Sequence, residues 1–155
     1  MIRVREATLA DAAEMSAFLR ELTALGKRIS PDSEEHVRRY YIGDPKKIAC
    51  SVAVDESDVL GFQSLKTAEE GNKWGVTPGW GIIGTHIRPS AARRGVGRTL
   101  FPVTLDAARA AGLAHIDASI AAHNAEGLAY YAAMGFHTYR TPDDLICKRF
   151  DVTAG

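Results

Sequence analysis

Residues 85–98 read THIRPSAARRGVGR, and they join the end of a predicted strand to the beginning of a predicted helix. Glycine carries no side chain, so Gly95 and Gly97 leave successive backbone N–H groups open to a ligand at a helix N-terminus. The helix dipole makes such a turn positive, and three arginines within six residues add charge in a chain whose formal net charge is zero. The stretch therefore predicts a phosphate or pyrophosphate site; the alternative is a glycine-rich turn with solvated arginines.

Apolar residues on both sides of this stretch alternate as in strands or recur at helical spacing. The expected strands are residues 2–5, 48–54, 59–65, 80–87, 114–120, 135–140 and 145–150, and the expected helices are residues 9–25, 33–41, 95–112 and 124–134. The strand–helix–strand unit over residues 81–120 requires a crossover and a parallel or diverging strand pair. We therefore predict an α+β fold, with a mixed, largely antiparallel central sheet flanked by helices on both faces, as a single domain over residues 1–155.

Charge and cysteine content limit the partners and the compartment. Lys and Arg total 19, as do Asp and Glu, so no basic field gathers nucleic acid or an anionic membrane surface. The N-terminus lacks the apolar run of a signal peptide, and no stretch is long enough to span a bilayer. Cys50 and Cys147 lie in apolar surroundings without metal-ligand spacing, so we expect buried thiols, no metal and a cytoplasmic protein.

Two competing phosphate motifs can be tested on the same sequence. A P-loop needs Gly-x4-Gly-Lys-Ser/Thr, and this string is absent from the chain. Residues 79–84, GWGIIG, match the dinucleotide fingerprint, but that fingerprint must follow a strand and open a helix. Here the pattern continues as a strand, so we interpret these glycines as strand positions that a backbone or ligand approaches closely.

Residues 92–97, ARRGVG, follow a strand and a proline and resemble the Gln/Arg-x-x-Gly-x-Gly/Ala string of the GNAT superfamily of acetyl-CoA-dependent N-acetyltransferases. The resemblance extends over residues 48–140 and implies that acetyl-CoA is the cosubstrate. Ala92 departs from the string, since Gln or Arg is usual there. Because the family binds the pyrophosphate largely through main-chain amides, we expect this departure to weaken one contact rather than remove the site.

A second motif of the resemblance lies downstream. Asn124 and Tyr131 are seven residues apart, which is two helical turns, so both can face one ligand. The resemblance implies that Tyr131 is the general acid that protonates the departing thiolate, whereas Tyr130 points elsewhere and is expected in the core. It also implies an acetyl carbonyl contact from the Ile87 amide, which would stabilise the developing charge. The full set of cofactor-binding residues implied is Thr85, His86, Ile87, Ala92, Arg93, Arg94, Gly95, Val96, Gly97, Arg98, Asn124 and Tyr131.

The general base has several alternatives. Many relatives carry a Glu five residues before the Asn, and here that position is Ser119. Asp117 shares the strand face of Ser119 and could act through water, and His86 lies on the predicted cofactor strand. A residue of the N-terminal third and a water relay also remain open.

The acceptor side is expected between residues 25–41 and 69–77, with walls from aromatic residues, although such residues are often core. The candidates are Tyr40, Tyr41, Trp74 and Trp80. We therefore predict an N-acetyltransferase that acts on a primary amine of a small molecule or peptide by direct attack in a ternary complex. The resemblance also suggests a homodimer. The alternatives are a non-catalytic acyl-CoA-binding or sensing module and a purely structural interaction domain.

Overall fold

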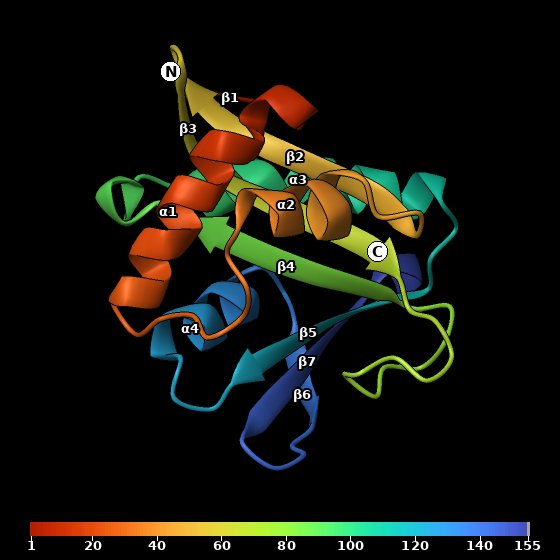
Figure 1. The fold of residues 1–155 in the computed structure, drawn as a ribbon. Helices are drawn as coiled ribbons and strands as arrows, with labels where there is room; N and C mark the ends of the chain where they lie inside the picture. Colours follow the sequence, from red (N-terminus) through yellow and green to blue (C-terminus); the bar gives the residue numbers. More distant parts are fainter. Residues whose placement is uncertain (155) are drawn as a thin grey trace.

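The computed structural model describes residues 1–154, which form one seven-stranded sheet in the order β1-β2-β3-β4-β5-β7-β6 (Figure 1). The strands are β1 (Ile2–Glu6), β2 (Lys47–Asp55), β3 (Asp58–Thr67), β4 (Gly81–Ile87), β5 (His115–Ala121), β6 (His137–Arg140) and β7 (Leu145–Asp151). Every neighbouring pair is antiparallel except β4 and β5. The predicted mixed, largely antiparallel sheet is therefore confirmed, and only Gly155 of the expected domain lies outside the described residues.

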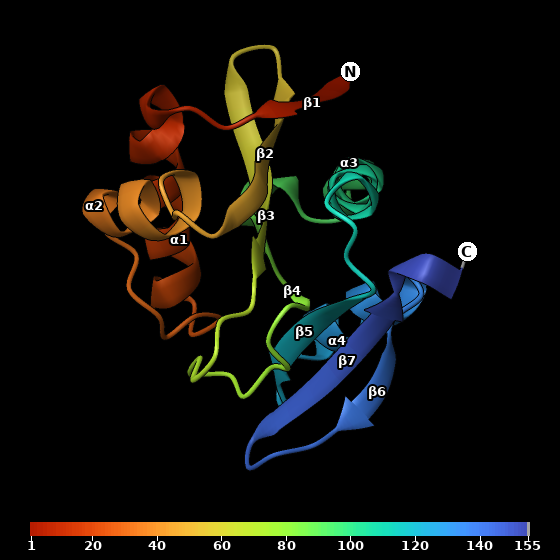
Figure 2. The same cartoon turned by 90° about the vertical axis from the view of Figure 1, so that its right-hand side faces the viewer.

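Helices cover both faces of the sheet, as predicted (Figure 2). Helices α1 (Ala12–Ala24) and α2 (Glu34–His36) lie on one face, and α3 (Val96–Ala110) and α4 (Ala125–Ala133) lie on the other. Within residues 1–154, no helix is both long enough and apolar enough to cross a bilayer.

Two predicted helices differ from the structure in detail. The first begins with a 3-10 turn at Leu9–Asp11 before α1. The second ends as an α-helix at His36 and continues as a π-helical turn over Val37–Ile42, where the Gly43 amide donates to the Arg38 carbonyl at 2.7 Å. The predicted helix over residues 33–41 is therefore present, but its second half is π-helical, because an i to i+5 bond replaces the usual i to i+4 bond there.

The hydrophobic core lies on both sides of the sheet. Between α1, α2 and the sheet, fully buried side chains include Met15, Phe18 and Phe62, and on the α3 and α4 side they include Leu65 and Ile116. Burying a side chain of this size contributes about 1.5–3 kcal/mol to stability. The helices are thus held against the sheet from both sides.

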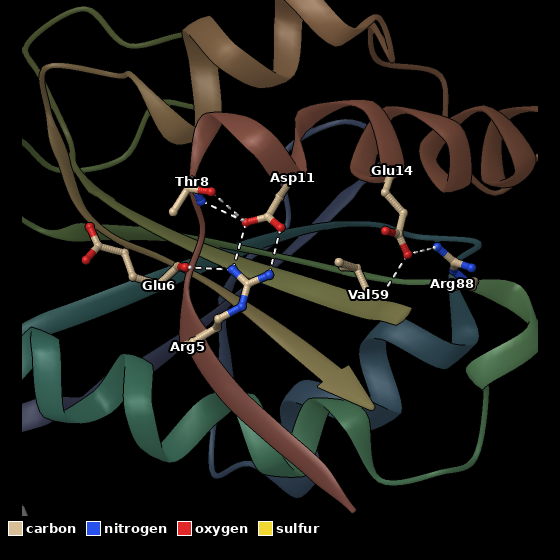
Figure 3. A network of polar contacts seen from close by, with 7 residues as sticks. All are labelled: Arg5, Glu6, Thr8, Asp11, Glu14, Val59 and Arg88. Carbon is tan, nitrogen blue, oxygen red and sulfur yellow. Dashed lines mark hydrogen bonds and ion pairs between the residues drawn. The ribbon is translucent and has the colours of Figure 1, made fainter. Parts of the chain in front are cut away.

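Polar contacts fix α1 to the strands that it covers (Figure 3). The Arg5 guanidinium donates to both carboxylate oxygens of Asp11, at 2.8 Å each. One turn later, the Glu14 carboxylate accepts from the Val59 amide at 2.7 Å and from the Arg88 guanidinium at 2.8 Å. Because Arg88 directly follows β4, α1 is tied to the segment that leads into the predicted phosphate loop.

The parallel pair β4 and β5 separates soon after it begins. Only Gly81 with Ile116 and Ile82 with Asp117 are paired, although both strands continue for several residues. The remainder of β4 keeps its bonds to β3 and leaves the edge toward β5 unpaired. Figure 1 shows the two strands diverging with α4 beside the opening, which confirms the predicted diverging pair.

Candidate active site

Unpaired backbone amides line the loop that enters α3. The left-handed residues Arg93 (φ 67°) and Gly95 (φ 75°) turn the chain immediately before the helix. Within residues 1–154, the amides of Gly95, Val96 and Gly97 and that of Arg98 donate no hydrogen bond. Four adjacent N–H groups at a helix N-terminus form a cradle that an anion can fill.

The second glycine of the string is in direct contact with Tyr130. The Tyr130 hydroxyl donates to the Gly97 carbonyl at 2.8 Å. A methyl group at position 97 would lie 2.4 Å from a ring carbon of Tyr130, far inside van der Waals contact. Glycine at this position is therefore required by the packing of α4 against α3.

The three arginines of the loop differ in their partners. Arg94 donates to Asp55 at 2.6 Å and is thereby tied to the turn between β2 and β3. Arg93 and Arg98 are exposed, and no carboxylate of the described residues lies within 4.0 Å of either. Two arginines of the predicted set thus remain available to a bound phosphate.

A row of hydrogen bonds joins β3 and β4 to α4. The Thr85 hydroxyl lies 2.8 Å from the Tyr131 hydroxyl, and the Gln63 amide nitrogen donates to Thr85 at 2.9 Å and to the Tyr130 hydroxyl at 3.0 Å. Gln63 is fully buried, yet its Oε1 has no hydrogen-bond partner in the described residues. A buried acceptor of this kind is costly unless a donor reaches it.

Tyr131 is the more buried of the two adjacent tyrosines. It is 7% exposed and packs on Phe136 with ring centroids 5.1 Å apart, whereas Tyr130 is only partly buried. Tyr130 packs against the core as expected, but its hydroxyl also reaches Gln63 and Gly97, which was not predicted. Burial raises the pKa of the Tyr131 hydroxyl above its ordinary value, so this phenol stays protonated at neutral pH.

Asn124 is the N-cap of α4, and its Oδ1 accepts from the Gly127 amide at 3.0 Å. Its amide nitrogen has no partner among the described residues and can still donate to a ligand. Beside it lies a cavity of about 240 Å³, lined by Gly26, Lys27, His123, Asn124, Ala125 and Glu126. The Lys27–Glu126 ion pair, at 3.0 Å, joins the segment after α1 to α4 across this site.

The His86 side chain lies on the α1 and α2 face of β4. Its ring packs against Phe62 at 4.7 Å and Tyr41 at 5.5 Å, and its Nδ1 lies 3.2 Å from Nη1 of Arg28. Burial, followed by the charges of Arg28 and His36, lowers the pKa of His86 to about 3. The imidazole is therefore neutral at physiological pH and a weak base.

Asp117 is fully buried on β5, with both carboxylate oxygens engaged. Oδ1 accepts from the Ser119 hydroxyl at 2.7 Å, and Oδ2 accepts a short hydrogen bond from the Tyr139 hydroxyl. The Arg140 guanidinium lies 3.8 Å from Oδ2. In this arrangement Asp117 is not placed to take a proton directly from an acceptor.

The four aromatic candidates for the acceptor wall are not brought together. Tyr41 lies against the His86 ring, whereas Tyr40 is 50% exposed and points away from the core. Trp80 packs on Tyr139, with ring centroids 5.6 Å apart, and the Trp74 carbonyl accepts a hydrogen bond from a neighbouring arginine of β6. Tyr41 is thus the candidate wall residue that contacts His86 of the predicted cofactor strand.

Residues 15–136 match the model of the acetyltransferase (GNAT) family. This chain belongs to the GNAT acetyltransferase family. Among solved structures, a GCN5-related N-acetyltransferase from Kribbella flavida is 22% identical, with a TM-score of 0.79 and 97% of each chain covered. The yncA protein from Salmonella typhimurium, solved with its cofactor acetyl-CoA, is 17% identical, with a TM-score of 0.72 over 99% of this chain and 95% of that one.

The PaiA N-acetyltransferase from Thermoplasma acidophilum, in complex with coenzyme A, is 15% identical, with a TM-score of 0.74 over 97% of this GNAT chain and 99% of that one. At these identities the likeness shows the fold. No curated protein matches the sequence.

The residues of this GNAT acetyltransferase fit the acetyl-CoA that its family uses as cosubstrate. The free amides of residues 95–98 suit a pyrophosphate, which accepts from several N–H groups at once. The buried Oε1 of Gln63, beside the opening of the sheet, suits a donor such as an amide N–H of the pantetheine arm. The anion cradle and the opening thus fit the two ends of one elongated ligand.

The sequence did not indicate two residues that border the candidate site. Gln63 occupies an inward position of β3, and the signal was one polar residue at an apolar position of an alternating strand. Arg28 lies within the expected acceptor segment, but nothing in the sequence distinguishes it from the neighbouring Lys27. Its position over His86 depends on the path of the loop after α1.

Proposed function

We propose that this chain transfers the acetyl group of acetyl-CoA to a primary amine of a small molecule or peptide, by direct attack in a ternary complex. In this reaction the amine nitrogen forms a bond to the acetyl carbon, the carbon–sulfur bond breaks, and the amine proton leaves. The observation that carries the proposal is the row of free amides at the start of α3, which leads to the opening of β4 and β5 beside Tyr131.

Binding of acetyl-CoA is assigned to three parts of the chain. The amides of residues 95–98, with Arg93, take the diphosphate, and the free edge of β4 at Thr85, His86 and Ile87 takes the pantetheine arm and the acetyl carbonyl. Asn124 donates from its unpaired amide nitrogen. Main-chain donors aimed at the carbonyl oxygen stabilise the charge that develops during attack.

Tyr131 is proposed as the general acid. Its raised pKa keeps the proton on the phenol until a thiolate is released, and the Thr85 hydroxyl at 2.8 Å fixes its direction. The phenol gives its proton to the coenzyme sulfur, so that the leaving group departs as a thiol. Tyr131 is then reprotonated from solvent.

The amine proton is proposed to leave through water. His86 borders the acceptor side, but with a pKa of about 3 it holds a proton weakly. Asp117 is fully buried and enclosed by Ser119 and Tyr139. A water relay, or an acceptor that binds in its neutral form, agrees best with these surroundings.

Thiol release with a panel of amines tests the proposal, together with thermal-shift titration by acetyl-CoA. A ligand present at a hundredfold excess over its Kd stabilises a protein by about 2.7 kcal/mol, so binding is visible without turnover. We expect both a shift and amine-dependent thiol release. A shift without thiol release from any amine would favour the acyl-CoA-binding module, and no shift would leave only the interaction domain.

The Tyr131→Phe substitution tests the acid. Because general acids contribute a hundredfold or more, we expect kcat to fall by at least about tenfold with little change in acetyl-CoA affinity. Tyr40→Phe is the matched control, since this tyrosine is exposed. Unchanged turnover in Tyr131→Phe would remove Tyr131 from the role.

We further propose that residues 1–155 form one domain and that the protein works in a reducing cytoplasm. The two cysteines, Cys50 and Cys147, are both free and buried, which supports the second point. The homodimer suggested by the family resemblance can be tested by light scattering coupled to gel filtration.

A further inference from the structure

The Arg28 guanidinium is held over His86 by neutral partners alone. Nη2 donates to the Pro31 carbonyl and to the Tyr41 hydroxyl, at 2.9 Å each, and Nη1 lies 3.2 Å from His86 Nδ1. The charged carbon also lies 5.9 Å from the centroid of the Tyr41 ring. These contacts fix the direction of the guanidinium and leave its charge uncompensated.

This lack of a carboxylate sets Arg28 apart from the other half-buried arginines in residues 1–154. Arg88 pairs with a glutamate at 2.8 Å, Arg149 with an aspartate at 2.9 Å, and Arg140 lies 3.8 Å from an aspartate. No carboxylate of the described residues lies within 4.0 Å of Arg28. A partly buried charge is costly unless an opposite charge accompanies it, so a bound anion is the natural partner.

Positive charges also act on His36, which packs against Tyr41 beside Arg28. The pKa of His36 is lowered by burial first, and then by the charges of Arg28, Lys73 and Lys66. Asp32 opposes this effect but does not reverse it. A local positive field beside the cofactor strand attracts an anion more than a simple ammonium group.

We propose that the acceptor of this acetyltransferase is an amine that also carries a carboxylate or another oxyanion, as an amino acid does, and that Arg28 binds this anion beside His86. The inference rests on the proposed function, because it names the acceptor class for the same site. The planar guanidinium matches the geometry of a carboxylate, and its contact with Tyr41 and His86 presents it already oriented.

The test compares amino acids with the amines that result when their α-carboxylate is removed, such as leucine with isopentylamine and phenylalanine with phenethylamine. Binding of each is measured calorimetrically on the full chain saturated with coenzyme A, and thiol release is measured with acetyl-CoA. We expect the unaltered protein to prefer the amino acid of each pair by at least about tenfold, because a site built for a polar group rejects the analogue that lacks it.

Arg28→Gln should remove this preference, because the affinity for the amino acid should fall at least about tenfold while the affinity for the amine falls much less. Arg28→Lys should retain part of the preference. Arg20→Gln is the matched control, because Arg20 is exposed on α1. The acetyl-CoA thermal shift of each variant verifies that it is folded.

Equal binding within each pair, an equal loss for both members in Arg28→Gln, or binding by no carboxylate-bearing acceptor would overturn the inference. An equal loss would make Arg28 a structural tie of the loop. Thiol release from amines that does not depend on Arg28 would keep the proposed function and reject the anionic acceptor. An Arg28-dependent preference in binding without any thiol release would reject the proposed function and keep the binding of the anion by Arg28.

Discussion

The contact between Gly97 and Tyr130 predicts that Gly97→Ala is destabilising because of one neighbouring ring. The family string admits alanine at this position, so the requirement for glycine comes from this chain's own tyrosine. A Cβ at residue 97 would lie 2.4 Å from Cε1 and 2.9 Å from Cζ of Tyr130. Carbon atoms in contact are about 3.5–4.0 Å apart, so the ring must move by about 1 Å or more.

The net cost follows from three contributions. Overpacking of this kind costs about 1–3 kcal/mol. Displacing the ring also weakens the bond from the Tyr130 hydroxyl to the Gly97 carbonyl, worth about 1 kcal/mol. Alanine in a helix gains about 1 kcal/mol over glycine, which offsets the second contribution. We therefore expect Gly97→Ala to lower the free energy of unfolding by about 1–3 kcal/mol.

A double-mutant cycle with Tyr130→Ala isolates the contact. Urea unfolding followed by circular dichroism gives the free energy of each variant. Once the ring is removed, Gly97→Ala should be neutral or stabilising, so the coupling should be about 1–3 kcal/mol. Gly95→Ala is the control, because its cost comes from a φ of 75° with no atom within 4 Å and should be similar in both backgrounds. If Gly97→Ala costs the same in both backgrounds within about 0.5 kcal/mol, the steric reasoning is refuted.

Two further predictions concern the ion pair at the start of α1 and the cysteines. The hydrogen bonds from Arg5, and to a lesser extent that from the Thr8 amide, hold the pKa of Asp11 below its ordinary value against the effect of burial. The ionised carboxylate therefore stabilises the fold above the unfolded-state pKa of about 3.9, and this contribution is lost as pH falls through the lower folded-state value. Asp11→Asn should cost about 1 kcal/mol at neutral pH, a modest figure because the Arg5 side chain is 45% exposed, and a cost that persists in strong acid would contradict this origin. Burial raises the pKa of the Cys50 thiol to about 12 and Cys147 is fully buried, so Ellman's reagent should label neither in the native protein and both after unfolding; rapid native labelling would contradict the packing.

The fold followed from the sequence wherever periodicity reports which face of an element is buried. The hairpin of β2 and β3 and the strand β4 were predicted within two residues at each end, because β-favouring apolar residues dominate them between clear turn signals. The position of β7 between β5 and β6 was not predicted, since alternation within a strand carries no information about which neighbour it pairs with. The π-helical turn after α2 was likewise not indicated by the spacing of the apolar residues.

The geometry of the candidate site could be predicted best where the backbone itself forms it. The loop before α3 was located because glycine, proline and arginine leave a local signature in sequence. Gln63 and Arg28 were missed, and the contact of Tyr130 with Gly97 was not predicted, because each depends on side chains that meet from separate elements. Which side chains of separate elements meet depends on the tertiary structure, and the spacing of residues along the chain does not contain this information.

The short ladder between β4 and β5 divides the sheet into two parts, one made of β1 to β4 and the other of β5, β7 and β6. Two residue pairs join these parts, whereas the ladders of β3 with β4 and of β5 with β7 have seven pairs each. An acetyl-CoA molecule that bonds to the unpaired edge of β4 and to α4 would also connect these two parts of the sheet. Binding of the donor would then also stiffen the junction between the two parts of the sheet, because the protein itself provides only two residue pairs there.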